Sequence, residues 1–550
     1  MRRALLPAAV ILFAGLSFPR IALAQGENAA AMRRGTFRLS IGGEWSQYTE
    51  RFGMANPLRP NLADGTLESI ATDFSAESLG VSQLTFLSAI QDSLRSLSGV
   101  GAFGLNLGRH RVTLSASVRH QPIRLHWAPS SRLVFGVHVP IVRARMSAFV
   151  LGPDTAVAES LSRGNVGFSA EFLTPGAMSL FRSEADAALL ALQATATSGP
   201  PALQAQAAAQ LAAMRPLVCG LSTLATSSAS DPASPCFVAG SAAPSVLLPV
   251  AGSDVGDSIT SRLTQSQTSY EATRASFAAQ GVTLPPFTAG FALPPAALDS
   301  SQLRRFMSDP FAPLAADSIT EVVRTGIGDM EVGAWFQLAD GNSLRSQLQV
   351  LVRLPTGTMD SPDALHDIGT GDHQTDVEVS LRNDVVFSQH LWLHAGGRYG
   401  VQMADQLERR VTPWYLPFAP FTSRALLDRD LGDYYAVDIV PNWQLDETIG
   451  VGIGWHYFHQ GATTWSYADP ADQARIGLAA DVLGEATSVS RMRIGAGVTF
   501  NTLPRFMAGR ARLPYRVTWS YNSTLWGRGG QVPKAGIMRL EIQAFFGNLR

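Results

Sequence analysis

The residues best suited to chemistry are acidic and histidine side chains gathered in one polar stretch, residues 360–376. They are Asp360, Asp363, His366, Asp367, Asp372, His373 and Asp376. Carboxylates on a flexible loop are the ligands that hard cations prefer, so the stretch could hold a divalent metal ion. Its spacing matches no calcium-binding loop, and acidic turns are common on protein surfaces. We therefore expect an acidic surface turn, with no metal and no cofactor.

Two histidines within apolar stretches, His394 and His456, are candidates for acid–base catalysis. A hydrolase would also need a nucleophile placed beside such a base, and the sequence indicates none near either residue. The glycines of 99–104 match a dinucleotide-binding pattern by letter only, because no strand of a βαβ unit precedes them. We expect a protein that is not an enzyme, and a hydrolase remains the least favoured alternative.

Most other charged side chains alternate with apolar ones along stretches of about ten residues. In the last stretch Met538, Leu540, Ile542, Ala544 and Phe546 share one face, and Arg539, Glu541 and Gln543 share the other. A soluble sheet rarely buries two opposite charges and an amide. A membrane barrel, by contrast, turns its apolar side chains to lipid and its polar ones to the lumen. The alternation therefore predicts an all-β fold, an antiparallel transmembrane β-barrel.

The same alternation assigns a set of charged residues to the lumen, because charges cannot be buried against hydrocarbon. The set is Arg38, Glu44, Arg119, Asp329, Glu331, Arg345, Arg353, Asp376, Glu378, Arg382, Arg398, Asp438, Arg491, Arg493, Arg516, Arg539 and Glu541. Such residues either line a wet, selective channel or tie a narrow barrel shut through ion pairs. Position along the sequence does not separate the two.

Twelve stretches carry this period, and fourteen strands is the alternative count. They lie near 36–49, 111–127, 132–149, 321–338, 344–356, 373–388, 391–404, 433–446, 448–463, 487–500, 513–526 and 536–547. Every long connection follows an odd-numbered strand, at 50–110, 150–320, 357–372, 405–432, 464–486 and 527–535. The long loops should therefore all lie outside the cell, with the short turns and both termini in the periplasm.

The N-terminus resembles a secretory signal peptide. Arg2 and Arg3 precede an apolar run, and Ala22-Leu23-Ala24 offers small residues for cleavage, so residues 1–24 should be removed. The alternative, an anchor helix, is disfavoured because the apolar run is short for a membrane span. Export and a barrel together predict the outer membrane of a Gram-negative bacterium. The expected partners are membrane lipid, periplasmic chaperones and the barrel-assembly machinery. A formal net charge of -1 gives no indication of nucleic acid.

The mature chain divides into first barrel strands at 25–149, an insertion at 150–320, and the remaining strands at 321–550. The insertion shows helical spacing from Ser183 to Met214 and again over 256–280, and the first long loop shows it over 76–98. The insertion should be an extracellular cap or a segment in the barrel mouth, or else a partly disordered surface segment. Cys219 and Cys236 lie within it, and export favours a disulfide between them.

One loop segment, residues 413–421, is strongly apolar although it should lie outside the cell. Its aromatic residues are Trp414, Tyr415, Phe418 and Phe421. Exposed apolar clusters often bind a ligand or partner, so we expect a docking site for a ligand. The alternative is that these rings pack against the insertion or touch lipid.

Several short motifs follow one another between Thr325 and Gly400. Gly326-Ile327-Gly328-Asp329 opens a strand, Arg353-Leu354-Pro355-Thr356-Gly357 ends the next, and Gly369-Thr370-Gly371 precedes Gln374-Thr375-Asp376-Val377-Glu378. This stretch resembles the barrel family named for the meta-pathway of phenol degradation, which is related to outer-membrane transporters of fatty acids and aromatic hydrocarbons. The resemblance covers about a third of the barrel and carries over no binding residue.

The resemblance implies an outer-membrane channel or transporter for small, apolar or aromatic organic compounds. A second class of function is a surface-interaction protein whose barrel only anchors the 150–320 insertion. Fold alone does not decide between them.

Overall fold

The computed structural model describes residues 32–151, 164–225, 234–236, 246–310, 313–317, 319–364, 366–547 and 549. The predicted signal peptide lies outside these residues. The chain forms two compact units. The barrel unit comprises Met1–Phe74, Val112–Val150 and Pro313–Arg550, and the helical unit comprises Ser75–Arg111 and Leu151–Ala312.

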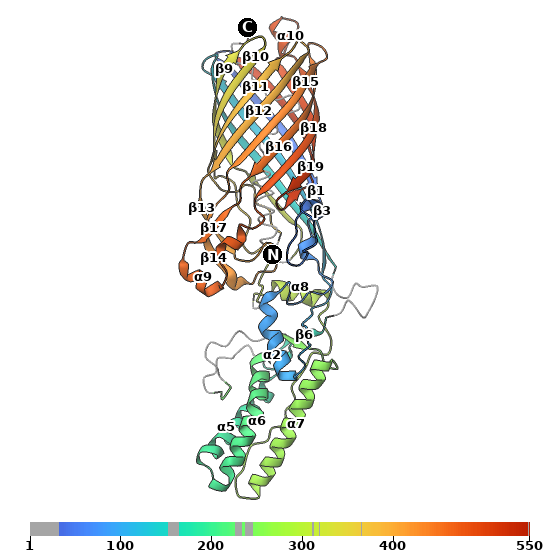
Figure 1. Ribbon diagram of the computed structural model, residues 1–550, viewed down its shortest axis with the longest axis vertical. Coiled ribbons are helices and arrows are strands. Elements are labelled where there is room, and N and C mark those ends of the chain that lie inside the picture. The colour runs from blue at the N-terminus through green and yellow to red at the C-terminus, as the bar shows by residue number, and fades with distance from the viewer. Residues whose placement is uncertain are drawn as a thin grey trace. The chain divides into compact units, whose positions relative to one another are not determined.

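The barrel unit is a closed antiparallel barrel of twelve strands (Figure 1). Its strands are β1 (Thr36–Tyr48), β4 (Arg111–Ala128), β5 (Leu133–Leu151), β8 (Val322–Ile327) with β9 (Met330–Asp340), β10 (Leu344–Leu354), β11 (Asp376–Val386), β12 (Leu391–Gln402), β15 (Tyr434–Gln444), β16 (Ile449–Gln460), β18 (Val489–Asn501), β19 (Tyr515–Arg528) and β21 (Gly536–Gly547). β1 pairs with both β21 and β4, which closes the barrel. The predicted count of twelve is confirmed.

The predicted strand at 321–338 is interrupted, which the sequence did not indicate. β8 and β9 both pair with β5, and they are separated by Gly328 and Asp329. The break lies opposite Pro140 of β5, whose carbonyl accepts a hydrogen bond of 2.8 Å from the Gly328 amide. Proline has no N–H to donate to the ladder, so regular pairing is weakest at this position.

The connections alternate between short and long, as predicted. The short turns and the C-terminal strand end share one end of the barrel, at the top of Figure 1, and the long connections leave the other end. Thr36 pairs with Gly547, so the first and last strands begin and end at the short-turn end. One short-end connection is longer because it contains α10 (Leu503–Met507).

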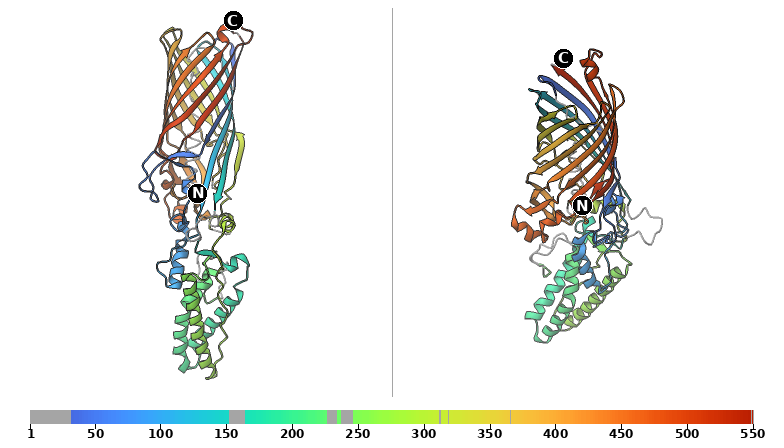
Figure 2. Two further views of the ribbon diagram at one scale, coloured as in Figure 1. Left: turned by 90° about the vertical axis from the view of Figure 1, so that its right-hand side faces the viewer. Right: turned by 45° about the horizontal axis from the view of Figure 1, so that its top comes forward.

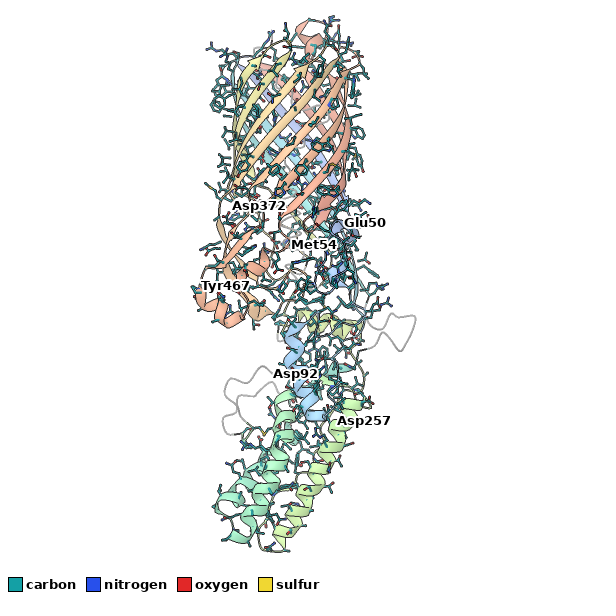
Figure 3. The ribbon with its side chains drawn as sticks, in the orientation of Figure 1. Glu50, Met54, Asp92, Asp257, Asp372 and Tyr467 are labelled. Atoms are coloured by element: carbon teal, nitrogen blue, oxygen red, sulfur yellow. A yellow bond between two sulfur atoms is a disulfide. The ribbon has the colours of Figure 1, made fainter. Side chains whose placement is uncertain are left out.

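The outer surface of the barrel is apolar. On β21, Met538, Leu540, Ile542 and Phe546 are exposed, whereas Arg539, Glu541 and Gln543 are at most 5% exposed. The same alternation runs along β15 and β16, and Figure 3 shows side chains projecting outward from the strands. This is the pattern expected of a wall that faces lipid.

Two small sheets lie in the long connections of the barrel unit. One contains β13 (Asp405–Arg410), β14 (Arg424–Asp430) and β17 (Thr464–Tyr467), and it packs with α9 (Pro470–Ile476) and η4 (Ala480–Leu483). The other contains β2 (Glu50–Gly53), β3 (Thr66–Ser69) and β20 (Val532–Pro533), followed by η1 (Thr72–Phe74). The sequence predicts loops for these segments, because strands of two to seven residues give little periodicity.

The helical unit contains the predicted helices. They are α2 (Ser88–Ser98), α4 (Ala170–Leu173), α5 (Ser179–Ser198), α6 (Pro201–Ala225), α7 (Asp254–Ala278) and α8 (Ser300–Ser308), with η2 (Thr85–Leu87), β6 (Val166–Phe168) and β7 (Leu247–Pro249). The single helix expected over 183–214 is two helices, because Gly199 and Pro200 interrupt it. Figure 2 shows α5, α6 and α7 from two further sides.

One covalent bond cross-links the helical unit. Cys219 of α6 and Cys236 form a disulfide, as predicted. Large apolar side chains fill the interior, including Phe181, Tyr270 and Phe277. Within the described ranges, no helix is both long enough and apolar enough to cross a bilayer.

Candidate lumenal site

The barrel interior holds most of the charged residues assigned to the lumen. Those that are buried are Glu44, Glu331, Arg353, Asp376, Glu378, Asp438, Arg491, Arg493, Arg539 and Glu541. Those that are half-buried are Arg38, Asp329, Arg345, Arg382, Arg398 and Arg516. Because these side chains alternate with exposed apolar ones along their strands, the interior wall is strongly polar.

Arg119 is an error in the predicted set. It is exposed and pairs across the sheet with Trp45, on the same outward face as Ile123 and Leu125. Alternate residues of β4 point inward and outward along its whole length, but the face that is polar changes. Near the long loops the inner residues of β4 are apolar. The alternation alone therefore placed Arg119 on the wrong side and missed Arg124, which is buried.

One group of interior charges ties β4 to β21. Glu541 accepts hydrogen bonds from Arg539 at 2.7 Å, from Gln543 at 2.9 Å and from Arg124 at 3.1 Å. Glu44 of β1 pairs in register with Arg539, so it adds a second acid to this group. The acids and arginines here are balanced in number, and the arrangement cross-links neighbouring strands.

A second group ties β5, β9, β10 and β11 together. Glu331 contacts His138 at 2.8 Å and Arg353 at 3.3 Å, and Arg353 also contacts Asp376. Both acids and the arginine are less than 10% exposed. Paired charges of this kind stabilise only as a set, because removing one partner leaves the others buried without a counter-charge.

The two histidines considered for catalysis each have an acid partner that the sequence analysis missed. His394 Nδ1 lies 2.7 Å from Asp384, and His456 Nδ1 lies 2.8 Å from Asp438. Both pairs join adjacent strands: β11 with β12, and β15 with β16. Each histidine is thus held against a carboxylate of the neighbouring strand.

The three sequence motifs meet at the interruption between β8 and β9. The loop that joins β10 to β11, residues 355–375, is called the β10–β11 loop here. Asp329 accepts hydrogen bonds from the backbone amides of Gly357 at 2.8 Å and Asp372 at 2.9 Å. A Cβ on Gly371 would lie 2.2 Å from the Asp329 carboxylate, so only glycine fits there.

Two threonines of the β10–β11 loop complete the backbone hydrogen bonding at the break. Thr356 Oγ1 donates to the Gly328 carbonyl at 2.7 Å and accepts from the Met330 amide at 2.9 Å. Thr370 Oγ1 donates to the Ile327 carbonyl at 3.0 Å. Side chains of the loop thus replace strand pairing, and the loop is fixed against the barrel wall.

The acidic stretch is held by arginines. Asp360 forms two hydrogen bonds with Arg409, at 2.6 and 2.8 Å, and both side chains are buried. Asp363 contacts Arg410 at 2.8 Å and Arg424 at 2.9 Å. In Figure 3, Asp372 lies at the end of the barrel from which the long connections leave. In the part of the chain that the structure describes, no group of three His, Cys, Asp or Glu residues could hold a metal ion.

Two members of the stretch have shifted pKa values. Burial raises the pKa of Asp367, but hydrogen bonds from Arg324 and from the amides of Ser361 and Ile368 outweigh it, so its pKa lies below the ordinary value. Burial lowers the pKa of His366, whose Nε2 contacts the Thr320 carbonyl oxygen. An ionised aspartate therefore anchors the loop at neutral pH.

The aromatic loop is packed rather than exposed. Trp414 and Phe418 are 4% and 3% exposed, and Tyr415 is half-buried. Phe421 is exposed, but the Arg410 guanidinium lies over its ring and its amide donates to Pro313. The expected exposure is therefore wrong for Trp414 and Phe418, and ligand docking at this loop stays a prediction.

An apolar cluster lies within the otherwise charged interior. This lumenal aromatic cluster consists of Phe52, Tyr434, Ala436, Phe458, Val489 and Val532. Tyr434 and Phe458 stack with their ring centroids 5.8 Å apart. Phe52 comes from β2 in the first long connection, so a loop residue packs against the inner face of β15 and β16.

A network of ion pairs around Arg51, called the Arg51 network here, fixes the segment that carries Phe52. Arg51 is 2% exposed and contacts Glu68 at 2.7 Å and Asp73 at 2.6 Å. Arg59 contacts the same two acids. Two arginines and two carboxylates therefore neutralise each other, and they position Phe52 at the long-loop end of the interior.

No protein-family model and no curated protein matches the chain. Among solved structures it is similar to an outer membrane channel from Pseudomonas putida F1, with 8% identity over 95% of this chain and 99% of that one, TM-score 0.41. It is also similar to the translocator domain of the autotransporter NalP from Neisseria meningitidis, with 6% identity over 96% and 95%, TM-score 0.31. The P. putida toluene transporter TodX matches with 9% identity over 94% and 91%, TM-score 0.27. These values are too low to assign a function.

Proposed function

We propose that the chain is an outer-membrane channel or transporter for small organic compounds that are apolar or aromatic. The observation that supports this most directly is the lumenal aromatic cluster, which stands inside a charged barrel interior. Aromatic rings with a few placed polar groups are the usual lining of sites for such ligands.

The barrel itself supports a membrane location. Because the barrel is closed, each strand forms its backbone hydrogen bonds with its two neighbours. This pairing is what allows β-structure to cross lipid. The outer face is apolar and the inner face is polar. On this proposal, residues 1–24 direct export, and the partners are membrane lipid, periplasmic chaperones, the barrel-assembly machinery and the small-molecule substrate.

The loops suggest how passage would be controlled. The β10–β11 loop is fixed to the barrel wall through Asp329, Thr356 and Thr370. The Arg51 network fixes the segment that contains Phe52. Both segments belong to the long-loop end, so their displacement would change access to the lumenal aromatic cluster.

The first test is ion conductance of the refolded, heat-modifiable protein in a planar bilayer, combined with uptake of benzyl alcohol into liposomes that contain it. Channel events or uptake above protein-free liposomes would support the proposal. A folded barrel that gives neither would contradict it. Phe458→Ala should lower benzyl alcohol uptake several-fold, because it removes one of the two stacked rings of the cluster. Trp443→Ala, an exposed residue of the outer face, is the matched aromatic control.

A second candidate is a surface-interaction protein anchored by the barrel. The observation that favours it is the compact helical unit with its own core and disulfide. Replacing Ser75–Arg111 and Leu151–Ala312 by short Gly/Ser linkers tests it. If uptake survives and cell-surface binding of a partner is lost, the barrel and the helical unit have separate functions.

A further inference from the structure

Two arginines on the inner face of β18 differ from the other buried charges of the barrel. Arg491 and Arg493 are two residues apart, so their side chains lie on one face about 7 Å apart at the backbone. They pair in register with Phe458 and His456 of β16. Their exposed fractions are 4% and 5%. Both guanidinium groups are therefore held inside the barrel.

Neither arginine forms an ion pair with any residue that the structure describes. Arg491 Nη2 and Arg493 Nε are buried and have no hydrogen-bond partner among those residues. By contrast, Arg353, Arg539 and Arg124 each contact a carboxylate within 3.3 Å. The pair on β18 is thus a local excess of positive charge.

The acids around this pair are engaged elsewhere. Asp438, one strand beyond His456, contacts that histidine at 2.8 Å and Arg398 at 3.9 Å. Glu44 interacts electrostatically with Arg493, but it is shared with Arg539 and Arg124. Arg398 adds a third positive charge that acts on both β18 arginines. The neighbourhood therefore remains cationic after its acids are counted.

Buried guanidinium nitrogens without a hydrogen-bond partner favour an anion that accepts from them. Guanidinium matches a carboxylate in geometry, because its N–H groups form two parallel hydrogen bonds. Two such groups on one strand face can both reach a single carboxylate. Charge and hydrogen-bonding capacity at Arg491 and Arg493 thus fit a carboxylate.

The same place offers an aromatic surface. The Arg491 guanidinium lies 4.2 Å from the centroid of the Phe458 ring. Phe458 stacks on Tyr434 and belongs to the lumenal aromatic cluster, together with Phe52. A ligand with a carboxylate against the arginines could therefore lay its apolar ring along this cluster.

We propose that Arg491 and Arg493, with the lumenal aromatic cluster, form a binding site for small aromatic carboxylates. This inference rests on the proposed channel function and narrows its substrates from apolar or aromatic compounds in general to those that carry an anionic head. Binding is reversible and involves no covalent step.

The test uses the full-length refolded protein, with benzoate and its neutral analogue benzyl alcohol as probes in isothermal titration calorimetry. Benzoate should bind saturably, and at least about tenfold more tightly than benzyl alcohol. Only benzoate carries a carboxylate that can complete the hydrogen bonds of the two arginines. Equal affinities, or no benzoate binding, would overturn the proposal. This comparison needs no variant.

Variants locate the site. Arg491→Gln and Arg493→Gln should each weaken benzoate binding at least about tenfold and leave benzyl alcohol binding unchanged. Arg145→Gln is the matched control, because Arg145 is exposed and pairs with Glu321 at 2.6 Å. Arg491→Lys and Arg493→Lys retain the charge and should keep a preference for benzoate if the glutamine variants do not refold. Unchanged benzoate binding in the glutamine variants would show that the binding site does not lie on β18.

Liposome uptake separates this inference from the channel proposal. If benzyl alcohol enters and benzoate has no advantage in binding or uptake, the channel stands and the carboxylate site fails. If neither compound enters and no conductance is seen, the channel proposal itself fails. Preferred benzoate uptake that is lost in Arg491→Gln and retained in Arg145→Gln supports both.

Discussion

Two parts of the barrel interior differ in whether their buried charged side chains are paired. On β9–β11 and in the β10–β11 loop, the carboxylates Glu331, Asp376, Asp360 and Asp367 each contact an arginine. On β18, Arg491 and Arg493 contact no acid that the structure describes. Paired charges hold strands and loops in place, whereas unpaired charges in a lumen are available to a ligand. The difference separates residues that maintain the barrel from residues that could serve transport.

The largest effect should follow from removing the arginine at the centre of the paired side. Arg353→Ala leaves Asp376 buried without its arginine and Glu331 with His138 alone. We expect the free energy of unfolding to fall by about 3–5 kcal/mol, measured by urea unfolding of the barrel in lipid vesicles. Arg345→Ala is the control: Arg345 is partly exposed and 4.0 Å from Asp340, so a loss below about 1 kcal/mol is expected. Equal losses would erase the distinction between buried and exposed pairs.

A smaller and local effect is expected at the break in the barrel wall. Asp329→Ala removes the acceptor for the amides of Gly357 and Asp372. Hydrogen bonds of this kind contribute about 0.5–3 kcal/mol each, so the β10–β11 loop should open more often. Hydrogen exchange of residues 355–375 should rise, and that of β19 should not. Asp340→Ala, at the exposed end of β9, should change neither. Slow exchange in Asp329→Ala would show that the loop has other anchors.

The paired loop should also respond to acid. The pKa of Asp367 is lowered in the folded protein, so its contribution is complete above the unfolded value of about 3.9 and is lost as the pH falls through the folded value. Limited proteolysis of the loop should therefore increase below about pH 4. Asp367→Asn should show raised cleavage already at pH 7 and a flatter profile. An identical profile in the variant would assign the acid response to other carboxylates.

The smallest effect on stability is expected on β18. Arg491→Leu removes a buried charge without orphaning an acid, so the free energy of unfolding should stay within about 1 kcal/mol of the parent value or increase. Urea unfolding under the conditions used for Arg353→Ala gives the direct comparison. A loss as large as that of Arg353→Ala would mean that Arg491 holds the barrel together and would count against a ligand role.

The sequence determined the barrel in nearly all its parts. The period-two alternation within β1, β16 or β21 is local, so it marks each strand without knowledge of its partners. The alternation of short and long connections then sets which strand ends lie together. Cys219 and Cys236 were also paired correctly, because few cysteines leave few choices.

The tertiary structure decided which charges are paired and which are not. Asp360 and Arg409 are 49 residues apart, and Arg124 and Glu541 are 417 apart, so no local pattern could join them. The face of β4 that is polar changes along the strand, which puts Arg119 on the outer face, and Trp414 and Phe418 are buried in the folded loops. Alternation is a property of one strand. Neutralisation and burial are properties of neighbours, and only the closed barrel with its folded loops brings those neighbours together.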